Sequence, residues 1–172
     1  MTNKKLKICV ISTTILPCPP VGYSGLEMIA WQIAEGLQAK GHDVTLVAPH
    51  GSKTNCTLHE TTLNEPERAA YSGYRAKLPQ FDVIIDHSWE KWSYILKAEG
   101  GLSSPILGVL HAPVNTMYMS PPPVASPSLV CISKDQSEGC REHLKCDSRV
   151  SYNGVDVNFY KNLNLKIGRA HV

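Results

Sequence analysis

A short loop directly before a predicted helix carries the residue types that could bind an anion. Gly22, Tyr23, Ser24 and Gly25 lie between a proline-rich stretch and a helical pattern that starts at Leu26. Backbone amides of such a loop, together with the positive end of the helix, can receive a phosphate group. The loop lacks the G-x-G-x-x-G pattern, and the chain has no G-x-x-x-x-G-K-S/T pattern. A nicotinamide-dependent dehydrogenase and a P-loop nucleotidase are therefore disfavoured.

Ser24 and Glu27 also predict how this helix begins. A serine followed three residues later by a glutamate is typical of a capping box. In that arrangement the serine hydroxyl accepts from the Glu27 amide, and the glutamate side chain accepts from the serine amide. The two side chains can thus be purely structural, while the backbone of the loop is the candidate anion site.

Two histidines directly follow predicted strands. His87 comes after the apolar run 82–86, and His111 comes after the run 106–110. The carboxyl ends of parallel strands meet at one edge of a sheet, where ligands bind in such folds, so both imidazoles are expected there. A structural role for each histidine is the alternative. No Ser/His/Asp, Cys/His or zinc-like spacing accompanies them, which disfavours hydrolases and metalloenzymes.

Three further polar or flexible residues follow predicted strands. Ser133 comes after the run 128–132, and Asn153 and Gly154 come after the short run 149–152. We therefore expect all three at the same edge of the sheet as the histidines.

One predicted helix carries a basic pattern. On the helix expected over 66–77, Arg68, Tyr71 and Arg75 recur at spacings of three and four. Such a face could contact an anionic membrane surface or an acidic acceptor. A solvated basic face is the alternative.

The segments that carry these residues alternate between apolar runs and helical patterns. Runs rich in β-branched residues predict strands, and apolar residues recurring every three or four positions predict helices. We expect strands at 6–12, 43–48, 57–63, 82–86, 106–110, 128–132 and 149–152. We expect helices from 26 to a stop at Gly41, at 66–77, from 89 to Gly100, and from 134 onward. This order predicts an α/β fold with a doubly wound, Rossmann-like parallel sheet covered on both faces.

The composition is that of an ordinary globular protein. The chain has 172 residues, 42% of them hydrophobic, and a net charge of +2, which predicts one domain and disfavours nucleic-acid binding. No stretch approaches the roughly twenty apolar residues of a membrane span, and the first apolar run is too short for a signal peptide. The six cysteines include no C-x-x-C pair, which indicates a reduced, cytoplasmic protein.

The last residues continue no periodic pattern. We interpret 163–172 as the start of a linker followed by a non-native tail, because the stretch from Ile167 to Val172 can be encoded by a common sequencing adapter. On this interpretation residues 1–162 form one domain, and the chain is half of a larger protein.

Taken together, these residues resemble the N-terminal domain of the group 1 glycosyltransferases, the retaining family four enzymes with a GT-B fold. The resemblance spans about residues 6–162. It rests on the order and spacing of the segments PVGYSGLE (20–27), KGHDVTLVA (40–48), DVIIDHS (82–88), HAP (111–113), CIS (131–133) and YNGVD (152–156), the last followed by Phe159.

The resemblance implies transfer of a sugar, with retention, from a nucleotide-sugar donor to an unknown sugar or lipid-linked acceptor. Gly22 and Gly25, with Tyr23 and Ser24 between them, match the family's loop near the donor phosphates and the acceptor. Ser24 stands where members of the family frequently have a glycine. The close approach of the backbone to the ligand at this position is therefore expected to differ. His111 matches the family histidine near the reacting sugar. The resemblance implies no metal and no other cofactor. The C-terminal nucleotide-sugar domain of the family is absent, so this chain alone is expected to be inactive.

From the cysteines and the basic residues we expect a cytoplasmic enzyme that could contact the inner membrane surface peripherally, and the sequence leaves the oligomeric state open. A UDP-sugar 2-epimerase of the same GT-B architecture is the alternative enzyme, although the loop from Gly22 to Glu27 fits it less well. A sugar- or nucleotide-binding module without chemistry is the alternative outside the enzymes.

Overall fold

A parallel sheet organises the chain. The computed structural model describes residues 4–114 and 122–154. Within these residues seven strands pair in the order β3-β2-β1-β4-β5-β6-β7, and every pair is parallel. Their bounds are β1 Lys7–Ile11, β2 Asp43–Pro49, β3 Thr57–Thr61, β4 Val83–Asp86, β5 Ile106–Leu110, β6 Ser128–Cys131 and β7 Ser148–Val150. The strand order reverses between β1 and β4, which is where doubly wound folds bind their ligands.

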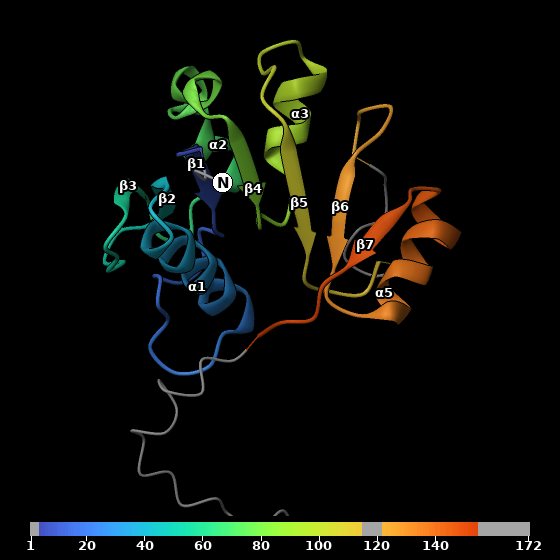
Figure 1. Cartoon of the computed structure of the whole chain (residues 1–172), viewed down its shortest axis with the longest axis horizontal. Helices are drawn as coiled ribbons and strands as arrows, with labels where there is room; N and C mark the ends of the chain where they lie inside the picture. Colours follow the sequence, from blue (N-terminus) through green and yellow to red (C-terminus); the bar gives the residue numbers. More distant parts are fainter. Residues whose placement is uncertain (1–3, 115–121, 155–172) are drawn as a thin grey trace, which may run out of the picture.

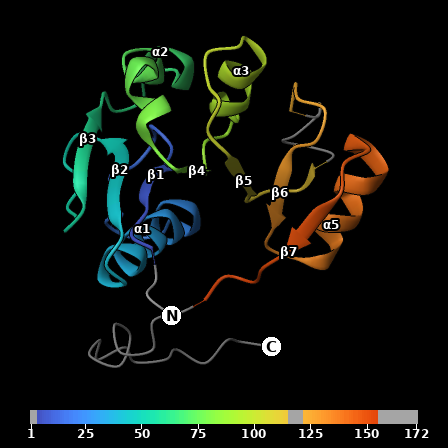
Figure 2. The same cartoon turned by 45° about the horizontal axis from the view of Figure 1, so that its top comes forward.

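Helices cover both faces of this sheet. In Figure 2, α1 lies on one side of the strands, and α2 and α3 lie on the other. The helices are α1 Gly25–Ala39, α2 Glu67–Ser72, α3 Trp92–Ala98 and α5 Lys134–Gly139, with a 3-10 helix at Arg75–Gln80 and a π-helical turn at Cys140–Leu144. The predicted doubly wound α/β fold is confirmed.

The central strand β1 is buried on both faces. Ile8 and Val10 pack with the apolar residues of α1, whereas Cys9 and Ile11 belong to the larger cluster on the opposite face. Successive strand residues point to opposite faces, so a strand covered on both sides reads as a continuous apolar run. Cys9 is fully buried there, as expected of a thiol that serves as a small hydrophobe.

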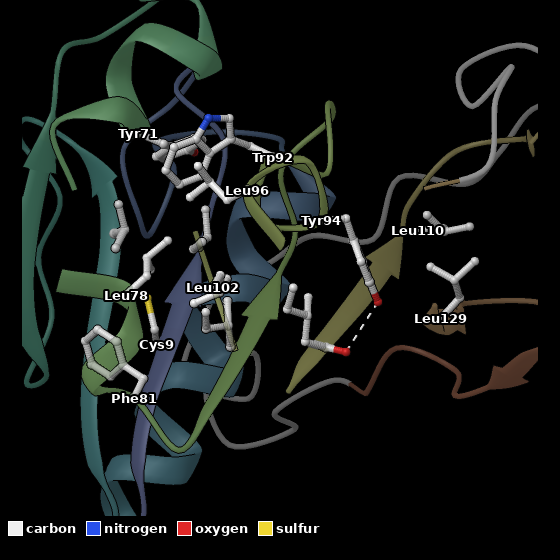
Figure 3. Packing of buried hydrophobic residues seen from close by; sticks show 14 of the residues in the cluster. Cys9, Tyr71, Leu78, Phe81, Trp92, Tyr94, Leu96, Leu102, Leu110 and Leu129 are labelled. Carbon is white, nitrogen blue, oxygen red and sulfur yellow. Dashed lines mark hydrogen bonds between the residues drawn. The ribbon is translucent and has the colours of Figure 1, made fainter. Parts of the chain in front are cut away.

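The larger apolar cluster joins α2 and α3 to the sheet, and Figure 3 shows Tyr94 reaching from α3 toward the strands. Its phenol oxygen accepts from the Gly108 amide at 3.2 Å and donates to the Ser128 carbonyl at 2.6 Å. A Cβ on Gly108 would come within 2.8 Å of the Tyr94 ring. The glycine in β5 is therefore required by the tyrosine that bridges β5 and β6.

The end of α1 follows the predicted stop. Gly41 has φ +91°, its amide donates to the Gln38 carbonyl at 2.9 Å, and the His42 amide donates to the Leu37 carbonyl at 3.2 Å. This pair of bonds is the Schellman motif, which needs a left-handed residue and so favours glycine.

The predicted basic helix face is wrong. Arg68 lies on α2, but Arg75 lies on the separate 3-10 helix and pairs with Glu99 at 3.5 Å. Tyr71 points into the core and is fully buried. The three residues predicted over 66–77 therefore share no exposed face. Within 4–114 and 122–154, no helix has the length and apolarity needed to cross a bilayer.

Candidate functional site

The loop before α1 ends at a serine whose hydroxyl does not cap the helix. Ser24 is the N-cap residue, with φ −159° and ψ 119°, but its hydroxyl donates to the Glu27 carboxylate. Glu27 is 3% exposed, and its other oxygen accepts from the Thr13 hydroxyl. The predicted capping box is therefore wrong. Glu27 turns inward because a buried hydroxyl that follows β1 binds it in place of the serine amide.

The same loop forms one wall of a small pocket of about 220 Å³, which we call the loop pocket. It is lined by Gly22, Tyr23, Ser24, Gly25, Met28, Ile29, Gln32, Asn153 and Gly154. Gly22 has φ +90°, a conformation that favours glycine, and the side chain of Tyr23 is 98% exposed. Because the Ser24 hydroxyl is turned toward Glu27, it does not satisfy the first amides of α1. The loop and Asn153-Gly154, both expected at the strand ends, thus meet at one place.

Figure 1 shows how the fold brings these segments together. The chain after β7, drawn in orange-red, runs below the sheet toward the loop that precedes α1, drawn in blue. This side of the sheet is also the one to which β5 and β6 point, so the loop pocket lies on the side of the carboxyl ends.

His87 and His111 contact each other at the ends of β4 and β5. His87 Nδ1 lies 2.8 Å from His111 Nε2, and the ring centroids are 5.0 Å apart. His87 is 0% exposed, whereas His111 is partly buried. The parallel pairing of β4 with β5 brings the two predicted histidines together, but His87 is buried and His111 is the one that lines a pocket.

That second pocket, the histidine pocket, has a volume of about 580 Å³. It is lined by His111, Ala112, Pro113, Val114, Ile132, Ser133, Asp135, Gln136, Glu138, Gly139, Glu142 and His143. Ser133 caps α5 by accepting from the Gln136 amide at 3.1 Å. The Gln136 side chain instead bonds the Ile132 amide at 2.8 Å and the Ala112 carbonyl at 2.6 Å. Gln136 thus joins the two loops that border the pocket.

A buried carboxylate at the end of β4 holds the segment that carries His87. Asp86 is 0% exposed, and its Oδ1 accepts from the Ser88 amide at 2.8 Å and from the Ser88 hydroxyl at 2.5 Å. Its Oδ2 accepts from the Ser93 amide at 3.1 Å and from the Ser93 hydroxyl. Four donors thus converge on one side chain and fix the path of the chain from β4 into α3.

Two more buried ionisable groups hold the same segment. Glu67, from α2, accepts from the Trp89 amide at 3.0 Å and the Glu90 amide at 2.8 Å. Lys91 has φ +50°, and its ammonium donates to the Ser88 carbonyl. Glu67 and Lys91 were not predicted from the sequence, because Glu67 lies on α2, more than twenty residues before the segment that it holds.

Burial shifts the pKa of both groups. Burial raises the pKa of Glu67 to about 7, although the hydrogen bonds from the two backbone amides lower it. It lowers the pKa of Lys91 to about 8, while the charges of Asp86 and Glu67 act in the opposite direction. Across the two stretches that the structure describes, no three His, Cys, Asp or Glu side chains lie close enough together to hold a metal ion.

Comparison with known protein families shows to which family this chain belongs. The family model described as Glycosyltransferase Family 4 matches residues 23–159, which is most of the chain. The chain belongs to glycosyltransferase family 4. The family 4 match includes both histidines and most of the loop pocket. A search of curated protein sequences finds no match.

Two solved structures share the fold of this family 4 domain. AviGT4, a glycosyltransferase involved in avilamycin A biosynthesis, is 23% identical with a TM-score of 0.61, and the match covers 88% of this chain and 42% of AviGT4. Sucrose-phosphate synthase from Thermosynechococcus elongatus is 16% identical with a TM-score of 0.65, and the match covers 88% of this chain and 49% of that one. The family 4 domain spans less than half the length of either protein. The predicted N-terminal Rossmann-like half of a GT-B fold is confirmed.

Proposed function

We propose that the chain is the N-terminal half of an enzyme that transfers a sugar, with retention, from a nucleotide-sugar to a sugar or lipid-linked acceptor. Membership of family 4 supports sugar transfer. The observation that carries the proposal is the loop pocket, where the start of α1, the Gly22–Gly25 loop and Asn153-Gly154 meet. A donor diphosphate suits this place because a helix N-terminus attracts and hydrogen-bonds anions.

The charge that develops during transfer gives this place its chemical role. As the bond between the sugar and the diphosphate breaks, negative charge grows on the leaving diphosphate. Fixed amide donors and the dipole of the 15-residue helix α1 stabilise that charge more strongly in the transition state than in the bound donor. We expect these groups, with basic residues from a second domain, to neutralise the diphosphate without a metal ion.

The acceptor side is assigned to the histidine pocket. His111 lines this pocket, and Ser133 and Asp135 provide polar groups along it, which suits a polyhydroxyl molecule. His111 is proposed to hydrogen-bond a hydroxyl of the sugar that is transferred. For a lipid-linked acceptor, the enzyme would work in the cytoplasm at the inner membrane surface.

The nucleotide of the donor is assigned to a second domain. Residues 1–162 form the first domain of this proposal, and 163–172 comprise the start of a linker followed by a non-native tail. The two solved structures are about twice as long as this chain, which supports a second half. Bound between the halves, the donor would present its sugar to His111 and its diphosphate to the loop pocket.

The loop pocket can be tested with a glycine substitution in the complete enzyme. Gly22→Ala meets no atom within 4 Å, but alanine at φ +90° is strained by about 1–2 kcal/mol, so the loop should shift. We expect kcat/KM for the nucleotide-sugar to fall about tenfold, because a displaced loop misaligns the amides that receive the diphosphate.

The matched control is Gly36→Ala, in the middle of α1. Gly36 also meets no atom within 4 Å and has an ordinary helical backbone, so alanine should stabilise the helix by about 0.5–1 kcal/mol and leave transfer unchanged. Equal kcat/KM for Gly22→Ala and Gly36→Ala would remove the loop from the donor site.

A further inference from the structure

His87 is fully buried behind His111, and its ring is held on one side only. Its backbone amide donates to the Ile11 carbonyl at 2.9 Å, which fixes the residue beside β1. Its Nδ1 faces His111 Nε2 at 2.8 Å. Its Nε2 is buried and has no hydrogen-bond partner among the residues that the structure describes. The two nitrogens of His87 therefore have very different surroundings.

Both rings are neutral at neutral pH. Burial lowers the pKa of His87 well below its ordinary value, and the Lys91 charge lowers it further. Burial and the Lys91 charge lower the pKa of His111 to about 3. A neutral imidazole has one N–H donor and one bare nitrogen. The contact at 2.8 Å therefore contains a single proton, carried either by His87 or by His111.

The buried Nε2 of His87 distinguishes the two arrangements. If His111 Nε2 carried the shared proton, His87 would have to be protonated at Nε2, which would bury an N–H donor without an acceptor. If His87 Nδ1 carries it, only a lone pair is left unpaired. Orphaned buried N–H donors are rare in proteins, and leaving one costs about 1–3 kcal/mol.

We propose that His87 is a positioning residue: its Nδ1–H donates to His111 Nε2 and so holds His111 in the tautomer protonated at Nδ1. With Nε2 engaged as an acceptor, His111 presents a hydrogen-bond donor at Nδ1 rather than a base. This assignment deepens the proposed function and rests on it for its role in transfer. There, a donor can bond a sugar hydroxyl, whereas proton abstraction by His111 is excluded.

The tautomers can be measured on the 172-residue chain itself, without any activity. Two-bond ¹H–¹⁵N correlation spectra of the labelled chain show which nitrogen of each imidazole carries a proton, and the His111→Gln variant identifies the His111 signals. We expect both His87 and His111 to be neutral and protonated at Nδ1, at pH 7 and still at pH 5. A His111 ring protonated at Nε2, or charged at pH 5, overturns the proposal.

Two variants of His87 test whether this residue sets the tautomer. In His87→Asn, the side-chain amide can replace the Nδ1 donor, whereas His87→Leu fills the space without a donor. We expect the Asn variant to keep His111 protonated at Nδ1 and the Leu variant to lose that preference. An unchanged His111 tautomer in a folded Leu variant contradicts the role of His87. If the Leu variant does not fold, the wild-type spectrum still decides between the two arrangements.

A rate measurement on the complete enzyme separates this assignment from the proposed function. His87→Leu should lower kcat about tenfold with little change in KM, and His87→Asn should restore most of the rate. If the spectra show the expected tautomers but His87→Leu transfers sugar at the full rate, the role of His111 in transfer is wrong. The tautomer assignment would stand in that case.

Discussion

His111→Gln is expected to lower kcat of the complete enzyme about a hundredfold, which is about 2.7 kcal/mol of lost transition-state stabilisation. The glutamine oxygen can still accept from His87 Nδ1, so the buried histidine keeps its partner. The variant loses the imidazole donor whose bond to the sugar hydroxyl strengthens as the glycosidic bond breaks. Because this bond acts mainly in the transition state, KM should change little.

Stability measured on the same preparation distinguishes a catalytic from a structural role. We expect the melting temperature of His111→Gln to stay within about 3 °C of the wild type. His111→Ala should be less stable by about 1–3 kcal/mol, because it leaves the Nδ1 donor of His87 unpaired. His50→Gln, on an exposed loop, is the control and should change neither quantity. A folded His111→Gln enzyme with wild-type kcat would exclude His111 from the site.

Asp86→Ala is expected to lower the free energy of unfolding by about 4 kcal/mol, the largest stability change that we predict. The substitution leaves the buried amide and hydroxyl donors of Ser88 and Ser93 without their acceptor. It also removes a negative charge that favours the charged form of the buried Lys91. Chemical denaturation of the 172-residue chain measures the change.

Asp82→Ala is the matched control at the other end of the same strand. Asp82 is exposed and accepts from the Lys7 amide at 2.8 Å, so its loss should cost about 1 kcal/mol or less. Similar losses for the two aspartates would show that the polar cluster after β4 adds no more to stability than an ordinary surface hydrogen bond.

The strands were predictable from the sequence because a parallel sheet buried on both faces requires continuous apolar runs. The run 106–110 predicts β5 at its observed bounds, and the stop of α1 at Gly41 follows from the left-handed conformation that glycine favours. The meeting of His87 with His111 follows from the same logic, since neighbouring parallel strands end side by side.

Contacts between residues far apart in the sequence could not be predicted. The capping box at Ser24 failed because Thr13, which precedes the loop, binds Glu27 in the interior. The shared face predicted over 66–77 failed because Tyr71 points into the core, where its hydroxyl donates to the Ser12 carbonyl. Local spacing cannot show these competitors, because only the folded sheet brings them within reach.

The polar cluster after β4 was missed for the same reason. Glu67 reaches across from α2 to two amides of a loop more than twenty residues later. Nothing in the local sequence of either segment pairs them. The loop pocket, in contrast, combines two segments that were each predicted at the strand ends. Only the contact between the two segments was not predicted.

Sugar transfer by the complete polypeptide, measured beside the 172-residue chain, tests the central claim most directly. Each protein is incubated with labelled UDP-, GDP-, ADP- and TDP-sugars and a lipid and polysaccharide extract, and labelled product is counted. We predict transfer from at least one donor by the complete polypeptide, retention of anomeric configuration in the product, and no transfer by the 172-residue chain. A folded complete polypeptide that transfers none of these sugars, or equal turnover by the 172-residue chain, would contradict the account.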